Sequence, residues 1–167
     1  MIRDADTLNA LLDTVNRFVR ERLVPVEAQV AETDEIPADI VADMKAMGLF
    51  GLTIREECGG LALTTEVGVE VMLAMGQTSP CFRSLFGTTV GIGSQGILFD
   101  GTPEQKAQYL PRLATGEIIA SFALTEPEAG SDAASLRTTA IRGTDAQGDH
   151  YIVNGTKRYI TNAPHAG

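Results

Sequence analysis

The sequence predicts an α+β fold, in which an all-α helical domain precedes the first strands of an antiparallel β domain. Apolar residues recur at helical spacing from residue 7 to residue 115. Beyond Gly116 the pattern changes to short apolar runs between turn residues, and Asn154-Gly155, a strong hairpin signal, separates two of them. We therefore place an N-terminal helical domain at residues 1–117 and the incomplete beginning of a β domain at residues 118–167.

The first helical segment is predicted over residues 7–32, where charged side chains separate apolar ones. Asp6 or Thr7 can cap its start, and Pro25 should kink or restart the helix because proline has no backbone N–H. A second helix is expected over residues 37–47, with proline in its first turn and glycine just past its end. Both helices have one apolar side, which indicates packing against a core.

A third helix is predicted from Thr64 or Thr65 to residue 77, and its apolar residues on most sides indicate burial. Residues 82–99 are ambiguous because they include four glycines, which weaken a helix. Glycines there would permit the close approach of another backbone or of a ligand. Tight helix packing and the lining of a ligand channel both remain open for this stretch.

The start of the next helix is clear from its capping residues. Thr102 is the predicted N-cap, Pro103 the first helical residue, and Gln105 the partner in a capping box. The helix should end at Thr115, because Gly116 is a good C-terminal stop.

The remaining residues predict strands. We expect strands at residues 118–125 and 138–142, a polar turn at 143–149, and a hairpin whose strands, 151–153 and 157–161, flank Asn154-Gly155. Three or four strands with an exposed edge are a poor stopping point for a sheet. We therefore expect either that the chain is a fragment of a longer protein or that another chain covers the edge.

Composition limits the function. The net charge of −9 and the pI of about 4.6 argue against nucleic-acid or anionic-membrane partners. No apolar run is long enough to span a bilayer, and the N-terminus has no hydrophobic signal core, so we expect a cytoplasmic protein. The two cysteines and two histidines lack metal-ligand spacing, so no metal site is predicted from them.

The most informative stretch is residues 121–132, where an apolar run enters a polar loop. Thr125, Gly130, Ser131 and Asp132 offer hydroxyls, a carboxylate and a glycine that permits close backbone approach, as in a loop that binds a small ligand or phosphate. The alternative is an ordinary turn, in which Ser131 or Asp132 caps a short helix beginning at Ala133.

Residues 122–132 resemble the signature loop of the acyl-CoA dehydrogenase family, and residues 154–163 resemble the next flavin-contacting strand of that family. Residues 51–60 and 100–116 also resemble its helical half. The resemblance implies an antiparallel β-barrel domain, with FAD between it and the helical domains. It also implies oxidation of an acyl-CoA thioester to the trans-2-enoyl-CoA, electron transfer to an electron-transfer flavoprotein, and a homotetramer or homodimer.

The resemblance also implies roles for individual residues. Ser131 should face the CoA portion of the substrate, and Tyr159 stands where many relatives carry tryptophan, so an aromatic ring can still stack on the flavin. The family's catalytic glutamate comes from a C-terminal helical domain that this chain lacks, so no catalytic residue is assigned, and Glu126 and Glu128 are left without a role. The residues expected to contact the cofactor are Phe122, Leu124, Thr125, Gly130, Ser131, Tyr159, Ile160 and Thr161.

Other interpretations remain open. An acyl-CoA oxidase or a flavin monooxygenase on the same fold would carry similar motifs, and the reactivity of its reduced flavin with oxygen would distinguish it. A non-catalytic helical interaction module would bind no flavin. Phe122 and Tyr159 could be core aromatics of a barrel, and Thr125 and Thr161 are favoured in strands whatever their function. The sequence does not indicate the length or branching of the acyl chain.

Overall fold

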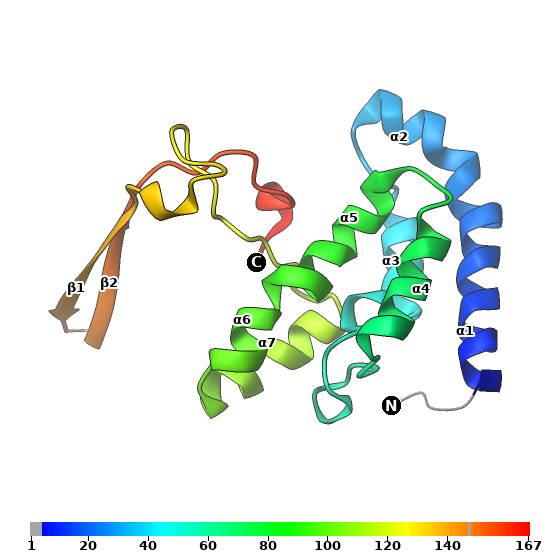
Figure 1. Cartoon of the computed structure of the whole chain (residues 1–167), viewed down its shortest axis with the longest axis horizontal. Coiled ribbons are helices and arrows are strands. Elements are labelled where there is room, and N and C mark those ends of the chain that lie inside the picture. Colours follow the sequence, from blue (N-terminus) through cyan, green and yellow to red (C-terminus); the bar gives the residue numbers. More distant parts are fainter. Residues whose placement is uncertain (1–4, 147) are drawn as a thin grey trace.

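The computed structural model describes residues 5–146 and 148–167, so the first four residues of the predicted helical domain and residue 147 of the predicted turn lie outside the described part. A body of helices carries two strands that project from it (Figure 1). The α-helices are α1 (Ala5–Phe18), α2 (Glu27–Thr33), α3 (Ala38–Ala46), α4 (Thr65–Met75), α5 (Pro80–Thr88), α6 (Gln95–Asp100) and α7 (Pro103–Ala114). The strands are β1 (Thr139–Asp145) and β2 (Gly148–Asn154).

Short helical turns join these elements. Two are π-helical, η1 (Val19–Leu23) and η5 (Thr89–Gly93). The others are the 3-10 turns η2 (Val24–Val26), η3 (Leu49–Gly51), η4 (Glu56–Cys58), η6 (Ala133–Ser135) and η7 (Ala163–His165). The predicted restart at Pro25 is confirmed, because proline lies in η2 between η1 and α2.

The predicted caps of α4 and α7 are confirmed, whereas the predicted cap of the first helix is wrong, because Asp6 and Thr7 lie inside α1. The hydroxyl of Thr64 accepts a hydrogen bond from the Val67 N–H at the start of α4. Thr102 and Gln105 form the predicted capping box at the start of α7. Pro37, however, is the N-cap of α3 and not its first helical residue, because its ψ of 138° is extended.

The glycine-rich residues 82–99 form helices, interrupted by the π turn η5. Ser94 N–H donates to the Thr89 carbonyl at 2.9 Å, five residues back, which is the π-helical pattern. A Cβ at Gly93 would lie 2.3 Å from the Cβ of Ala120, so at this glycine Ala120 packs directly on the helix. Close packing therefore accounts for Gly93.

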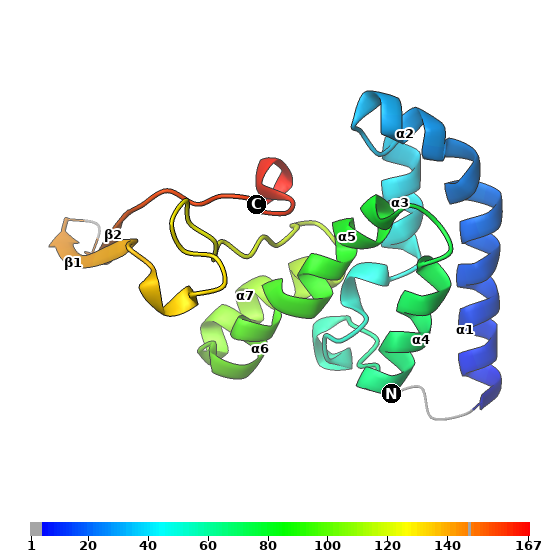
Figure 2. The ribbon, with the colours of Figure 1, turned by 45° about the horizontal axis from the view of Figure 1, so that its top comes forward.

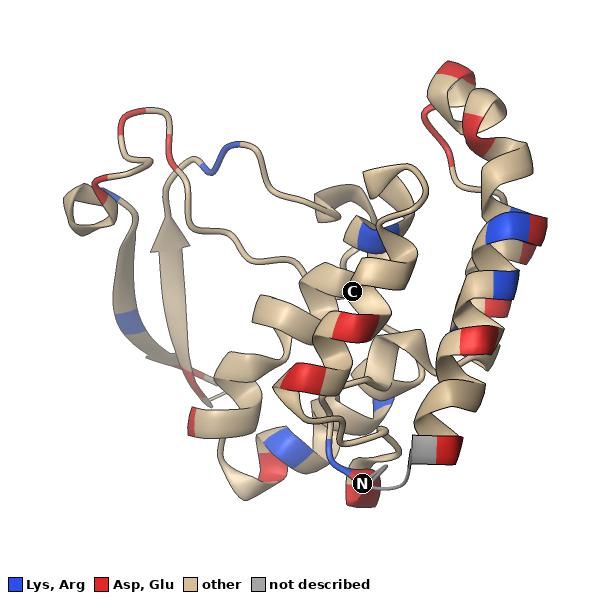
Figure 3. Cartoon of the chain, turned by 45° about the vertical axis from the view of Figure 1, so that its right-hand side comes forward, with Lys and Arg blue, Asp and Glu red and all other residues tan. Residues whose placement is uncertain are grey.

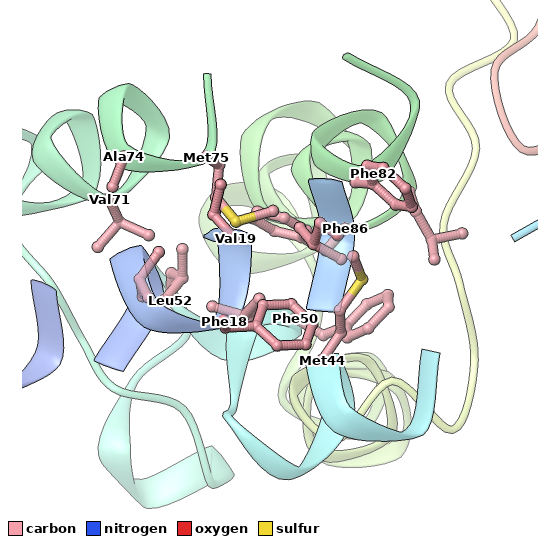
Figure 4. Packing of buried hydrophobic residues seen from close by; sticks show 14 of the residues in the cluster. Phe18, Val19, Met44, Phe50, Leu52, Val71, Ala74, Met75, Phe82 and Phe86 are labelled. Carbon is pink, nitrogen blue, oxygen red and sulfur yellow. The ribbon is translucent and has the colours of Figure 1, made fainter. Parts of the chain in front are cut away.

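The hydrophobic core lies among α1, α3, α4, α5 and η3 (Figure 4). The Phe50 and Phe86 rings meet edge to face, with centroids 6.3 Å apart. A second, smaller cluster joins α7 to the chain on either side of it. The largest side chains with almost no exposure are Phe50, Phe82, Phe86, Leu23, Ile40, Met44, Leu49, Leu52, Ile54, Met75, Leu110 and Val15.

The strands β1 and β2 pair antiparallel from Thr139–Asn154 to Asp145–Gly148. The hairpin prediction at Asn154-Gly155 is therefore wrong, since the turn follows Asp145 and β2 ends at Asn154. The predicted strands at 138–142 and 151–153 and the polar turn between them are confirmed, but the turn is shorter than predicted because polar side chains at both of its ends pair across the hairpin and extend the strands. Asp149 accepts a hydrogen bond from Thr144 at 2.6 Å and forms an ion pair with Arg142.

Two further strand predictions are wrong. Residues 118–125 form only an isolated bridge, between Ile119 and Ala166, and the Ala120 N–H donates to the Thr89 hydroxyl of η5 instead of to a strand. Residues 157–161 are irregular because Tyr159 has a φ of +59°, a left-handed conformation that no extended strand contains.

Figure 3 marks the charged residues along the ribbon, and several of them lie on α1. Arg22 of η1 forms ion pairs with Asp39 and Asp43 of α3, at 2.8 and 2.9 Å.

Cys58 and Cys81 are not in a disulfide. Among the described helices, none is long and apolar enough to cross a membrane.

Candidate functional site

The two segments that carry the predicted site residues lie side by side. We call residues 121–132 the first segment and residues 154–163 the second segment. Ser121 Oγ donates to the Thr161 carbonyl at 2.6 Å, and the Arg158 N–H donates to the Thr125 carbonyl at 2.8 Å. Lys157 Nζ donates to the Leu124 carbonyl at 3.0 Å. The two views of the chain show these segments next to each other between the helices and the hairpin (Figures 1 and 2).

Polar contacts with α5 and η5 fix the second segment, and the residue just before the first segment, on the helical part. Asn162 Nδ2 donates to the Leu85 carbonyl at 2.9 Å, near the middle of α5. The Ala120 N–H donates to Thr89 Oγ1 at 3.1 Å, and the Thr89 side chain is fully buried. The site therefore borders α5, as well as the two segments themselves.

The predicted aromatic residues lie at the surface. Phe122 is 48% exposed and Tyr159 is 80% exposed. The Arg158 guanidinium lies 4.7 Å from the centroid of the Tyr159 ring, which is a cation–π geometry. Both rings are therefore accessible to a planar ligand, and neither is a core residue in this structure.

The other predicted residues follow the same two segments. Leu124, Thr125 and Ile160 are half-buried, whereas Gly130, Ser131 and Thr161 are exposed. The structure thus brings Leu124 and Thr125 next to the second segment. Gly130 and Ser131 lie beyond a tight turn, in which the Glu126 and Ala129 backbones are hydrogen bonded to each other in both directions.

The short helix η6 begins at Ala133, as the turn interpretation predicts, with Asp132 as its N-cap. The Asp132 carboxylate accepts a hydrogen bond from Ser135 Oγ at 2.5 Å. The Asp132 carboxylate thus stabilises the local conformation of the loop.

Glu126 is the buried carboxylate of the site, with 6% of its surface exposed. Its Oε2 accepts from the Arg137 N–H at 2.7 Å, and its Oε1 accepts from the Thr138 N–H at 2.9 Å, from the Thr138 hydroxyl and from Lys157 Nζ at 2.9 Å. These donors, led by the Thr138 hydroxyl and followed by the Arg137 N–H and Lys157, lower the pKa of Glu126 to about 2. Glu126 is therefore ionised at neutral pH.

Sequence reasoning missed this network. Glu126, the Arg137–Thr138 pair and Lys157 are separated by 11 to 31 positions, and no periodicity connects them. One available signal was the placement of a carboxylate at the end of an apolar run, where a buried charge requires partners.

A cavity of about 600 Å³ lies beside the second segment, between α2, α3 and α5. Val30, Val41 and Leu85 contribute apolar walls, and Lys45 and Asn162 contribute polar groups. None of the predicted cofactor-contacting residues lines it. Within residues 5–146 and 148–167, no three His, Cys, Asp or Glu side chains are grouped so that they could hold a metal ion.

Comparison with known proteins identifies the family. The model of the acyl-CoA dehydrogenase N-terminal domain matches residues 5–117, and the model of the middle domain matches residues 121–167. The chain belongs to the acyl-CoA dehydrogenase family. The site described above thus lies largely within the match to the middle domain of this family.

Similar proteins are longer than this chain. It is 35% identical to an acyl-CoA dehydrogenase of Bacillus subtilis over 148 residues, which are 89% of this chain and 38% of that protein. It is 41% identical to (2S)-methylsuccinyl-CoA dehydrogenase of Cereibacter sphaeroides over 159 residues, which are 95% of this chain and 28% of that protein. The chain also resembles the crystal structure of an acyl-CoA dehydrogenase from Bacillus anthracis complexed with FAD. The sequence identity is 33% and the TM-score is 0.85, over 99% of this chain and 28% of that chain.

Proposed function

We propose that this chain forms the N-terminal, flavin-facing part of an FAD-dependent acyl-CoA dehydrogenase. The enzyme would oxidise an acyl-CoA thioester to the trans-2-enoyl-CoA and pass the electrons to an electron-transfer flavoprotein, as a homo-oligomer. The observation that supports this most strongly is the pairing of the two segments, which places exposed aromatic rings and half-buried hydroxyl and aliphatic groups on adjacent backbone. The family relative from Bacillus anthracis is described in complex with FAD.

The residues present fit a flavin. Phe122 and Tyr159 offer accessible ring faces for stacking, and the aliphatic side chains of Leu124 and Ile160 offer apolar contacts. When bound, FAD supplies the two-electron acceptor for the dehydrogenation. We propose that the hydroxyls of Thr125 and Thr161 hydrogen bond to the polar edge of the ring system, since each can donate and accept.

The loop beyond the tight turn faces the other ligand in this proposal. Gly130 and Ser131 are both exposed, so the backbone and the Ser131 hydroxyl are accessible to the CoA portion of the substrate. We also propose the domain division at residue 117, which the concentration of buried apolar residues before that position supports.

The chain offers no suitable base for removing the α-proton of the thioester among the two glutamates of the first segment. All hydrogen bonds to Glu126 stabilise its ionised form, and a carboxylate with a pKa of about 2 has little affinity for a proton at neutral pH. Glu128 pairs with Arg137 at 3.1 Å on the surface. We therefore expect that this chain alone shows no steady reduction of a dye by acyl-CoA.

The test is a titration of the purified protein with FAD, followed by flavin fluorescence and the visible spectrum. Tyr159→Ala should raise the dissociation constant for FAD about 3- to 10-fold, because a stacked aromatic pair is lost. Tyr151→Ala is the matched control, since Tyr151 is 66% exposed on β2. Equal affinities for the two variants would contradict the proposed site.

Oxygen reactivity separates the dehydrogenase from an oxidase or monooxygenase. Reduced flavin in the holoenzyme should be reoxidised slowly by oxygen and quickly by an electron-transfer flavoprotein. Fast reoxidation by oxygen alone would contradict the assignment as a dehydrogenase and would favour an oxidase or a monooxygenase.

A further inference from the structure

The loop of residues 126–138, which leads from the first segment into β1, is closed by a single side chain. Glu126 stands at one end of residues 126–138, and Arg137 and Thr138 stand at the other. The carboxylate accepts hydrogen bonds from the two backbone N–H groups and from the Thr138 hydroxyl, so it joins both ends of the loop directly. Gly130 and Ser131 lie inside the closed loop.

The same carboxylate connects this loop to the second segment. Lys157 Nζ contacts Glu126 Oε1 at 2.9 Å and the Leu124 carbonyl at 3.0 Å, so one ammonium group joins both segments. The Glu126 side chain is 6% exposed and that of Lys157 is 24% exposed. A charge pair this well shielded, with additional hydrogen bonds to the carboxylate, is costly to break on one side only.

We infer that Glu126 is a positioning residue, whose carboxylate holds the loop carrying Gly130 and Ser131 in one conformation relative to the second segment and thereby prepares the surface that binds FAD and the CoA portion of the substrate. This inference rests on the proposed function. It assigns to Glu126 a role without proton transfer, because all of the hydrogen bonds described for its carboxylate are directed at the ionised form.

The closed loop has a clear physical advantage for binding. A loop of this length that is ordered only when the ligand arrives pays the cost of ordering out of the binding free energy. A carboxylate that fixes the loop beforehand removes that cost. Glu128 provides the contrast, since its ion pair with Arg137 is between side chains that are 68% and 77% exposed, and such pairs contribute little.

The experiment compares Glu126→Gln with Glu128→Gln in the purified protein. Glutamine has nearly the same shape, but it brings an NH₂ group towards a site that is filled with donors. Hydrogen exchange of the Arg137 and Thr138 amides, followed by NMR at neutral pH, should become at least about 10-fold faster in Glu126→Gln. Exchange in α4 and α7 should stay unchanged, and Glu128→Gln should behave as the wild type throughout.

The ligand readout uses FAD as the probe. Glu126→Gln should weaken FAD binding roughly 10-fold, and Lys157→Arg, which keeps the charge, should bind nearly as the wild type does, whereas Lys157→Met should resemble Glu126→Gln. Wild-type amide exchange in Glu126→Gln would overturn loop closure. Fast exchange with unchanged FAD affinity would overturn the positioning role. If the wild type itself bound no FAD, the proposed function would fail together with the ligand-binding half of this inference, and amide exchange would still decide on loop closure.

Discussion

The helical part, residues 5–117, and the remainder of the chain, residues 118–167, which we call the arm, are held together by different forces. The helical part contains nearly all of the buried apolar side chains, and Ile118 and Ala129 are the buried apolar residues of the arm. The arm is held mainly by hydrogen bonds to η5 and α5, by the pairing of its two segments, and by Glu126. The difference suggests that substitutions in the two parts will have effects of different size and kind.

The largest effect should come from the helical core. Phe86→Ala removes a fully buried ring that packs against Phe50, and it should lower the free energy of unfolding by about 3–5 kcal/mol. Urea denaturation followed by circular dichroism measures this. Phe99→Ala is the control, because Phe99 is 73% exposed and its loss should have little effect. Similar losses for both variants would mean that the core is not where the structure places it.

An intermediate effect is expected at the junction of the two parts. Gly116 has a φ of +69°, and a Cβ there would lie 2.9 Å from the Phe50 ring, so Gly116→Ala should destabilise the protein by about 1–3 kcal/mol. Gly68→Ala in α4 is the matched control, since its Cβ would meet nothing within 4 Å. That variant should be neutral or more stable by about 0.5–1 kcal/mol, because alanine favours helix. Thermal or urea unfolding of the pair would sharpen the contrast, and destabilisation by Gly68→Ala would contradict it.

The effect of the arm on stability should depend on pH. The pKa of Glu126 is lowered from 4.5 to about 2 in the folded protein, so its carboxylate stabilises the fold fully above about pH 4.5 and progressively less as the pH falls towards 2. The difference in unfolding free energy between wild type and Glu126→Gln should therefore shrink over this range. Urea denaturation at several pH values measures it, and a constant difference would exclude ionisation of Glu126 as the cause.

The helical part and the arm also differ in how well the sequence predicts them. Helix starts at Thr64 and Thr102 and the stop at Gly116 follow from rules that act within a few residues, and the structure confirms them. The fold class also follows from the change of pattern after Gly116. The limits of the arm's strands could not be predicted, because a strand needs a partner and Ala120 pairs with the Thr89 hydroxyl instead.

Some features of the candidate site could be predicted from the sequence and others could not. The family resemblance predicted both segments, and the hydrogen bond between Ser121 and Thr161 shows that they are adjacent. The left-handed backbone of Tyr159 has no signal in the sequence, since tyrosine is ordinarily favoured in strands. The network around Glu126 depends on partners far along the chain. The roles of the individual residues in binding FAD or CoA remain predictions.

The π turn η5 has a consequence for how this sequence tolerates insertions and deletions. Its i→i+5 hydrogen bond accommodates one residue more than an α-helical turn, and Thr89 and Gly93 of this turn both meet Ala120 of the arm. Deletion of one residue within this turn would convert it to an α-helical turn with little rotation of the helical residues that follow, because the turn already accommodates one extra residue. Thr89 and Gly93 would then be three positions apart and would still share one face of the helix, so the contact with Ala120 of the arm could survive the loss of a residue from this turn.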